Sequence, residues 1–181
     1  MPIMYSPKEF KITKTNLVYD HFLRVRQDLV QTPNGNIVDY NYVDAKNDAV
    51  IVLPIQDGKI VMLRQYRYPI KKYVYDLPAG GIELGKTKLA AAKDELKEET
   101  GYIAKKIRYI NSFYHVPGMS NSTVHAYLAT DLARGETDLE KSEFAEVILV
   151  SISKFEKLLL TKKIESTIAA TYLSAKLKKL I

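Results

Sequence analysis

The stretch GGIELGKTKLAAAKDELKEETGY, residues 80–102, contains a helical pattern that follows a glycine-rich turn and ends at a glycine. Thr87 is suited to cap the start of a helix, and Gly101 is suited to end it. Between them, three apolar residues recur at a spacing that places them on one helical face. They are Leu89, Ala92 and Leu96. The pattern predicts a helix over residues 87–100 whose apolar face packs on a core.

Three glutamates lie close together on the predicted helix. At about 100° per residue, Glu95, Glu98 and Glu99 fall within a sector of roughly 100° beside the apolar face. Glu95 and Glu99 repel each other by a few tenths of a kcal/mol, which a bound divalent cation would reverse. Magnesium binds a few carboxylates and keeps sites for phosphate oxygens, so the trio predicts a phosphate-directed metal site. The alternative is a solvated acidic face, with Lys93 and Lys97 as helical partners.

The segments around this helix have mostly strand-like patterns separated by turn residues. Turn signals occur at residues 33–36 (PNGN) and 57–58 (DG), the second of which predicts a hairpin. Strands are predicted over 17–26, 28–31, 37–43, 49–53, 59–64, 73–77, 107–114, 123–129 and 146–151, and further helices over 153–160 and 164–181. Many strands, one helix, more strands and then helices indicate an α+β fold with a mixed or antiparallel sheet.

Length and composition exclude several classes of protein. The 181 residues suffice for one domain of ordinary size, and the absence of cysteine excludes disulfides, thiolate metal sites and a cysteine nucleophile. No apolar run is long enough to cross a membrane, and residues 1–10 lack a secretion signal, so a cytoplasmic protein without a membrane partner is expected. The net charge of +6 admits nucleic acid binding. However, lysines at the end of the last helix, where they favour the helix dipole, explain this positive charge adequately, so no nucleic acid partner is predicted.

Residues 80–102 resemble the Nudix hydrolase family, whose motif is G-x5-E-x7-R-E-U-x-E-E-x-G-U, with U a bulky apolar residue. Seven positions match in register: Gly80, Glu95, Leu96, Glu98, Glu99, Gly101 and Tyr102. Two positions depart, since Lys86 replaces the first glutamate and Asp94 replaces the arginine. Because the two changes are opposite in charge, we expect Lys86 and Asp94 to form a salt bridge of reversed polarity.

The resemblance extends over roughly residues 17–176, to the branch of ADP-ribose pyrophosphatases. Residues 63–67 (LRQYR), residues 77–80 (LPAG) and Pro117, sixteen positions after Gly101, are similar to that branch. It implies an α/β/α sandwich with a mixed sheet over residues 46–181, preceded by a small antiparallel β subdomain over residues 1–45 that supports dimerisation. It also implies Mg²⁺-dependent cleavage of a nucleoside diphosphate sugar, with Mn²⁺ as an alternative ion, by a homodimer whose N-terminal strands help build the partner's site.

The same resemblance implies roles for individual residues. The metal would be held by the backbone carbonyl of Ala79 with Glu95, Glu98 and Glu99. Arg67 would hold substrate phosphate or ribose, although a surface salt bridge is an alternative for it. Val116, Pro117 and Gly118 would line the sugar end of the site. Tyr40, with Tyr42 nearby, falls where relatives place an aromatic residue against adenine, but strand tyrosines equally serve packing.

The catalytic base is left open. Relatives carry a glutamate where this chain has Ser122, and Lys141 occupies a position where some have the base. Glu140, Glu143 and Glu146 are the available carboxylates, of which Glu143 aligns best, while His115 and His125 are weaker candidates. Two other functions compete with the pyrophosphatase: a Nudix hydrolase for another nucleotide, and a module that binds a nucleotide without hydrolysing it.

Overall fold

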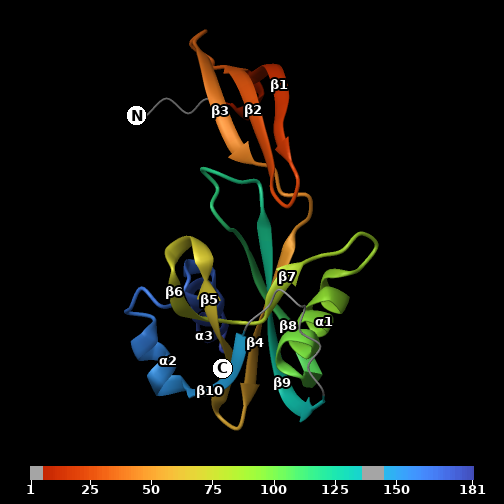
Figure 1. The fold of residues 1–181 in the computed structure, drawn as a ribbon, viewed down its shortest axis with the longest axis vertical. Helices are drawn as coiled ribbons and strands as arrows, with labels where there is room; N and C mark the ends of the chain where they lie inside the picture. The colour runs from red at the N-terminus through yellow and green to blue at the C-terminus, as the bar shows by residue number, and fades with distance from the viewer. Residues whose placement is uncertain (1–5, 136–144) are drawn as a thin grey trace. The chain divides into compact units, whose positions relative to one another are not determined.

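A computed structural model of the protein describes residues 6–135 and 145–181, which fold into two compact units (Figure 1). The first comprises Met1–Lys46 together with Tyr114–Ser122, and the second comprises Asn47–Phe113 together with Thr123–Ile181. The sequence predicts a boundary between the N-terminal subdomain and the Nudix domain at residues 45 and 46. The structure adds a segment from the middle of the chain to the first unit, because residues 114–122 connect two strands and bond to the end of the N-terminal sheet.

The first unit is built on a three-stranded antiparallel sheet, in the order β1-β2-β3. Its elements are the 3-10 turn η1 (Pro7–Glu9), β1 (Lys11–Asp20), β2 (Arg24–Gln31) and β3 (Ile37–Val43). The predicted turn over residues 33–36 is confirmed, with Gly35 at φ 86°. The predicted strand over residues 17–26 is wrong, because the chain reverses after Asp20, where the His21 N–H donates to the Leu23 carbonyl oxygen at 3.0 Å. That turn contains no glycine or proline to reveal it.

The second unit contains a seven-stranded mixed sheet. Five strands follow the order β10-β5-β4-β9-β8, while β6 pairs with β5 and β7 pairs with β4. The strands are β4 (Ala49–Gln56), β5 (Lys59–Arg67), β6 (Lys72–Asp76), β7 (Ala79–Gly81), β8 (Tyr102–Tyr114), β9 (Thr123–Arg134) and β10 (Ala145–Ser151), with the 3-10 turn η2 (Tyr68–Ile70) between β5 and β6. The β4–β9 pair is parallel and β4–β5 is the predicted antiparallel hairpin, so the sheet is mixed as expected. The short strand β7 was predicted as a turn.

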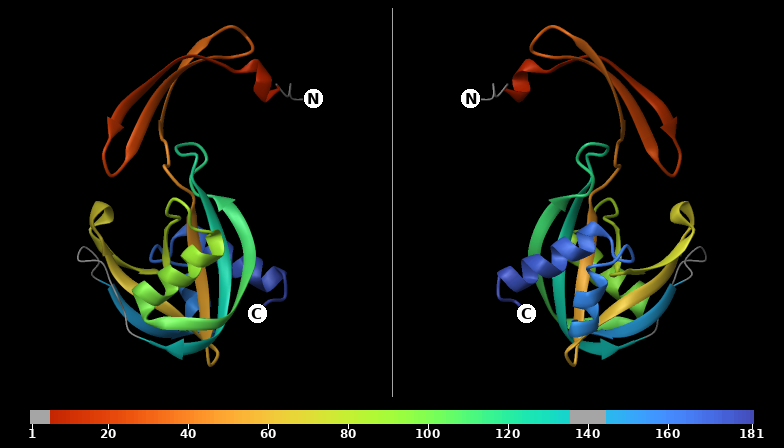
Figure 2. Two further views of the ribbon diagram at one scale, coloured as in Figure 1. Left: turned by 90° about the vertical axis from the view of Figure 1, so that its right-hand side faces the viewer. Right: turned by 90° about the vertical axis from the view of Figure 1, so that its left-hand side faces the viewer.

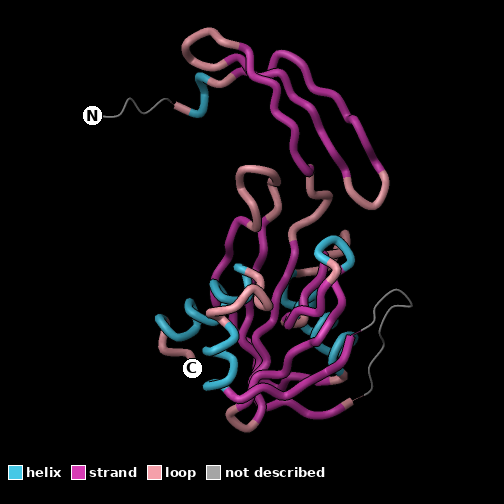
Figure 3. Tube along the Cα trace, turned by 60° about the vertical axis from the view of Figure 1, so that its left-hand side comes forward, coloured by secondary structure: helices cyan, strands magenta, loops and turns pink. Residues whose placement is uncertain are grey.

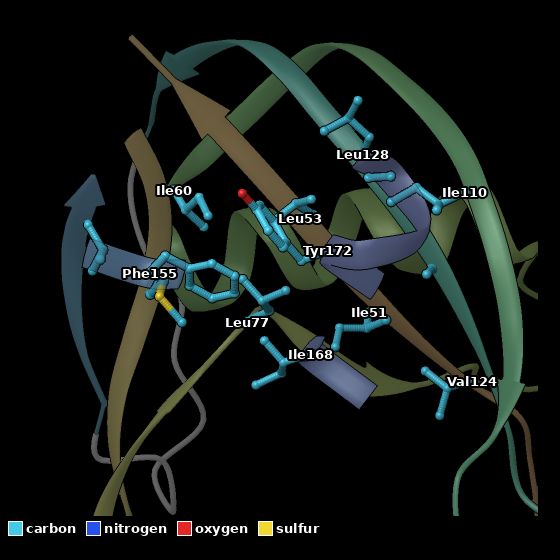
Figure 4. Close-up of a cluster of buried hydrophobic side chains, with 14 residues drawn as sticks. Ile51, Leu53, Ile60, Leu77, Ile110, Val124, Leu128, Phe155, Ile168 and Tyr172 are labelled. Carbon is cyan, nitrogen blue, oxygen red and sulfur yellow. The ribbon is translucent and has the colours of Figure 1, made fainter. Parts of the chain in front are cut away.

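Helices cover both faces of this sheet (Figures 2 and 3). They are α1 (Lys88–Thr100), α2 (Ile152–Leu158) and α3 (Ser166–Leu177). Alternate residues of β4 point to opposite sides, so Val52 packs in the cluster that includes Leu96 of α1. Leu53 packs in the other cluster, with Phe155 of α2 and Tyr172 of α3, whose rings lie 4.8 Å apart (Figure 4). The predicted α/β/α sandwich is therefore confirmed.

Helix α1 begins and ends where the sequence predicts. The Thr87 side chain accepts a hydrogen bond from the Ala90 N–H at 3.1 Å, and Gly101 ends the helix in the left-handed region at φ 71°. Leu96 is fully buried as predicted, but Leu89 is 42% exposed, so the buried face of the helix begins at Ala91 and not at Leu89. Within the described residues, no helix is long and apolar enough to span a membrane.

Candidate functional site

Two glutamates of α1 converge on the short strand β7. Glu99 is buried, and its Oε2 accepts a hydrogen bond from the Ala79 N–H at 2.9 Å. The carboxylate of Glu95, one helical turn earlier, lies against Gly80, where a Cβ would be 2.5 Å from Oε2. Pairing with β4, in which Gly80 faces Val50, fixes the strand. The sequence therefore positions two carboxylates and a segment of backbone together.

The donor chemistry of this arrangement suits a hard divalent cation. Glu95 and Glu99 supply carboxylate oxygens, which Mg²⁺ prefers, and the missing side chain at Gly80 leaves the room that the Glu95 carboxylate occupies. Glu98 lies on the exposed side of α1. Within residues 6–135 and 145–181, no three acidic or histidine side chains are grouped as a ready metal site. The set Glu95, Glu98, Glu99 and the Ala79 carbonyl therefore remains a prediction.

Arg67 lies at the end of β5 and is held by a buried acid. Its Nη2 and Nε lie 2.7 Å and 2.9 Å from Oδ2 of Asp76, which is 4% exposed. Burial raises the pKa of the Asp76 carboxyl, and the Arg67 guanidinium opposes that rise. The arginine is half-exposed and has further N–H donors beyond these two contacts. Sequence reasoning missed Asp76, although an acid at the end of an apolar strand segment was a usable signal.

The expected reversed salt bridge is present in the loop that leads into α1. Lys86 Nζ lies 3.0 Å from Asp94 Oδ2 and 3.0 Å from Glu83 Oε2. Hydrogen bonds to Glu83 and then to Asp94 raise the pKa of Lys86 above its usual range. The two departures from the motif therefore compensate each other in charge and join the loop to the helix that carries the glutamates.

The first unit brings together several of the residues expected to bind substrate. A cavity of about 490 Å³ is lined by aromatic and loop residues. They are Tyr40, Tyr42, Tyr114, Pro117, Gly118, Met119, Ser120 and Asn121. Tyr40 is 51% exposed, so it is not a core residue, whereas the hydroxyl of Tyr42 donates to Asp28 Oδ2 at 3.3 Å. Val116 instead lines a second cavity, of about 390 Å³, in the same unit.

The residues considered as the catalytic base lie in different surroundings. Glu143, with Glu140 and Lys141, lies outside the described residues. Glu146 pairs with Arg64 at 3.3 Å on the surface of the sheet. His125 is buried and its Nε2 lies 3.0 Å from Asp48 Oδ2, as is usual for a structural histidine. The choice of Glu143 as the base therefore stays a prediction.

Comparison with known proteins agrees with this geometry. The model of the NUDIX domain matches residues 45–171. The ADP-ribose pyrophosphatase of Bacillus subtilis (strain 168) is 31% identical over 178 residues, covering 96% of each chain. The methanol dehydrogenase activator of Bacillus methanolicus is 30% identical over 171 residues, covering 91% of this chain and 92% of that protein. The ADP-sugar pyrophosphatase of Mus musculus is 36% identical over 137 residues, 69% of this chain and 63% of that protein.

A solved structure, described as an ADP compounds hydrolase, superimposes with a TM-score of 0.86 at 20% identity, covering 96% of this chain and 95% of that one. At that identity the likeness supports the fold alone. The family model spans more than half of the chain, and the B. subtilis relative is similar over nearly its whole length. The chain therefore belongs to the Nudix hydrolases, in the branch of the family that contains the ADP-ribose pyrophosphatases.

Proposed function

We propose that this protein hydrolyses the pyrophosphate bond of ADP-ribose or a related nucleoside diphosphate sugar, releasing a nucleoside monophosphate and a sugar phosphate. The observation that carries the proposal is the convergence of Glu95 and Glu99 on β7, next to Ala79 and Gly80. The names of the relatives support the substrate class, since several of them act on ADP-ribose or ADP-sugars. We also propose that the protein acts in the cytoplasm.

The proposed cofactor is Mg²⁺, with Mn²⁺ as an alternative. Glu95, Glu98, Glu99 and the carbonyl of Ala79 would hold it, because they offer hard oxygen donors on neighbouring elements. When bound, such an ion neutralises charge on the pyrophosphate and makes water a better nucleophile. The half-buried hydrogen bond from the Ala79 N–H helps to orient the Glu99 carboxylate before any ion arrives.

The remaining roles are assigned to polar and aromatic residues. Arg67, oriented by Asp76, would bind phosphate or ribose with its free N–H donors. Tyr40 would contact the adenine ring of the substrate, and Val116, Pro117 and Gly118 would contact its sugar. Glu143 is the proposed general base. A base must reach its water before its pKa matters, so this last role needs direct testing.

We also propose a homodimer formed through the N-terminal sheet. The three strands and the residues next to them expose many large apolar side chains for so small a sheet, and such surfaces favour association. They include Phe10, Ile12, Leu17, Val18, Phe22, Ile37 and Val38. Sedimentation equilibrium should give a mass of two chains, and a monomer at micromolar concentration would refute this part of the proposal.

The central experiment follows AMP release from ADP-ribose with Mg²⁺, for the wild type and for Glu99→Gln. The variant keeps size and the hydrogen bond from Ala79 but loses the charge, so we expect turnover to fall by about 100-fold or more. Glu156→Gln is the matched control, because Glu156 lies on α2, on the face of the sheet opposite α1, and bonds to Tyr172 and Lys176. It should keep wild-type turnover.

The outcomes separate the competing functions. AMP release that is lost in Glu99→Gln supports the pyrophosphatase. No product from ADP-ribose, but product from another member of a nucleotide panel, would move the chain to a different Nudix substrate. Binding of nucleotides without any product would identify a binding module and overturn the proposal.

A further inference from the structure

A side-chain contact joins two segments of the first unit that are far apart in sequence. Asn121 Nδ2 donates to Asp44 Oδ1 at 2.8 Å across 77 positions. The same amide uses its oxygen, since Asn121 Oδ1 accepts from the Ala45 N–H at 2.7 Å. Both ends of the Asn121 side chain therefore bond to residues that directly follow β3.

Asp44 is held firmly on its other side. It is 8% exposed, and its Oδ2 lies 2.6 Å from Arg26 Nε and 2.9 Å from Arg24 Nε. One carboxylate oxygen thus faces two guanidinium groups while the other accepts from Asn121. The paired charges, chiefly the hydrogen bond from Arg26, lower the pKa of Asp44 below its usual value. A buried carboxylate satisfied in this way is a fixed anchor for Asn121.

The backbone strengthens the same junction. The Val43 N–H donates to the Met119 carbonyl oxygen at 2.8 Å, and Val43 forms a parallel bridge with Ser120. The Asp44 N–H donates to the Arg24 carbonyl oxygen at 2.8 Å, which ties the junction to β2. Residues 119–121 of the loop are therefore bonded to the end of β3 by main chain and side chain together.

This junction lies between the two walls of the tyrosine-lined cavity. Tyr40 and Tyr42 come from β3, while Tyr114 is the last residue of β8 and Pro117 and Gly118 come from the loop that follows it. Asn121 itself lines the cavity, and Asp44 lines the second one. Because the walls belong to separate segments, the bonds of Asn121 add to the backbone bonds of Val43 in fixing the distance between them.

We propose that Asn121 is a positioning residue, which through Asp44 holds the loop 114–122 against β3 and so shapes the cavity for the nucleotide sugar. This rests on the proposed function, in which Tyr40, Pro117 and Gly118 contact substrate. Asn121 acts on binding, whereas the glutamates of α1 act on chemistry. Its loss should therefore raise KM and leave kcat nearly unchanged.

The test compares three variants with a matched control. Asn121→Ala removes both side-chain bonds, and Asn121→Asp places a second carboxylate against Asp44. The double variant Asp44→Asn with Asn121→Asp restores one donor–acceptor pair and keeps a carboxylate near the two arginines. Asn41→Ala is the control, since Asn41 is an exposed residue of β3 that bonds to Asp39.

Two measurements distinguish failure of this inference from failure of the proposed function. Amide hydrogen exchange at Ala45 needs no activity, and it should become about tenfold faster in Asn121→Ala but not in Asn41→Ala. KM for ADP-ribose should rise about tenfold in Asn121→Ala and more in Asn121→Asp, with kcat within about twofold, and should recover in the double variant.

Unchanged exchange at Ala45 would overturn the junction itself. Faster exchange with an unchanged KM, or with kcat falling while KM stays constant, would overturn the positioning role. If the wild type hydrolyses no nucleotide, the proposed function fails, and binding of ADP measured by calorimetry then replaces KM: a weaker affinity in Asn121→Ala supports the inference, and an equal affinity refutes it.

Discussion

Substitution of Gly80 by alanine tests the arrangement of the carboxylates most directly. A Cβ at this position would come within 2.5 Å of all three atoms of the Glu95 carboxyl group, nearest to Oε1, against about 3.4 Å or more for ordinary contact. The neighbouring atoms belong to a side chain, so the backbone stays in place and the carboxylate must withdraw by about 1 Å or more. Gly80 does not have a positive φ, so alanine adds no backbone strain.

The expected effects on rate and on stability differ in size. A misplacement of roughly 1 Å in a catalytic group costs about 100-fold in rate, so turnover of ADP-ribose should fall by about that factor. Replacing a glycine by alanine at a compatible position restricts the unfolded chain and stabilises by about 0.4–1 kcal/mol, which offsets part of the cost of moving Glu95. The free energy of unfolding should therefore change by less than about 2 kcal/mol.

The assay measures AMP release at saturating Mg²⁺ together with urea-induced unfolding. Gly81→Ala is the matched control, because a Cβ there meets nothing within 4 Å and the same restriction of the unfolded chain applies. We expect it to keep wild-type turnover. If Gly80→Ala turns over as fast as Gly81→Ala, then the position of the Glu95 carboxylate against β7 is not needed for the reaction, and the reasoning fails.

Two further predictions concern charge. Lys86→Glu should lower the thermal midpoint and the turnover, because it places a third negative charge beside Glu83 and Asp94. The double variant with Asp94→Lys should recover part of both, since Glu83 keeps a like charge beside residue 86; a double variant no better than the single one would show that residues 86 and 94 do not act as a pair. Asp44 has a lowered pKa because of Arg26, so its contribution to stability is present above its unfolded value of about 3.8 and is lost as pH falls through the lower folded value. The difference in unfolding free energy between wild type and Asp44→Asn, measured by urea titration, should therefore be constant near neutral pH and shrink below pH 3.8, and a difference that grows in acid would contradict the assignment.

The features that the sequence predicts well are those with local causes. Helix α1 is bounded by its own cap and its own glycine, and the β4–β5 hairpin follows from Asp57 and Gly58, both at positive φ. The reversal after Asp20 escaped because its turn residues carry no such preference, so the alternating pattern continued across it. The parallel pairing of β4 with β9 joins Ala49 to Val124, and no local signal specifies such a contact.

The candidate site follows the same rule. The carboxylates of α1 could be placed on one side of a helix from spacing alone, and the salt bridge between Lys86 and Asp94 could be expected because the two residues depart from the family motif with opposite changes of charge. The burial of Asp76 beneath Arg67 and the bonds of Asn121 depend on packing between distant segments. In the sequence, nothing around Asn121 hints at the contact with Asp44.

The motif positions in this chain differ in the kind of constraint that acts on them, and this explains which ones have changed. Residues 86 and 94 need opposite charges at contact distance, a condition that survives exchange of the signs. Gly80 is constrained by volume, since any side chain would occupy the place of the Glu95 carboxylate. Glu99 is constrained by the hydrogen bond from Ala79, and in the proposed function also by the negative charge that the cation would require. A departure from the motif at a position of the first kind is therefore compatible with an active enzyme, whereas we expect a departure at Gly80 or Glu99 to cost most of the activity.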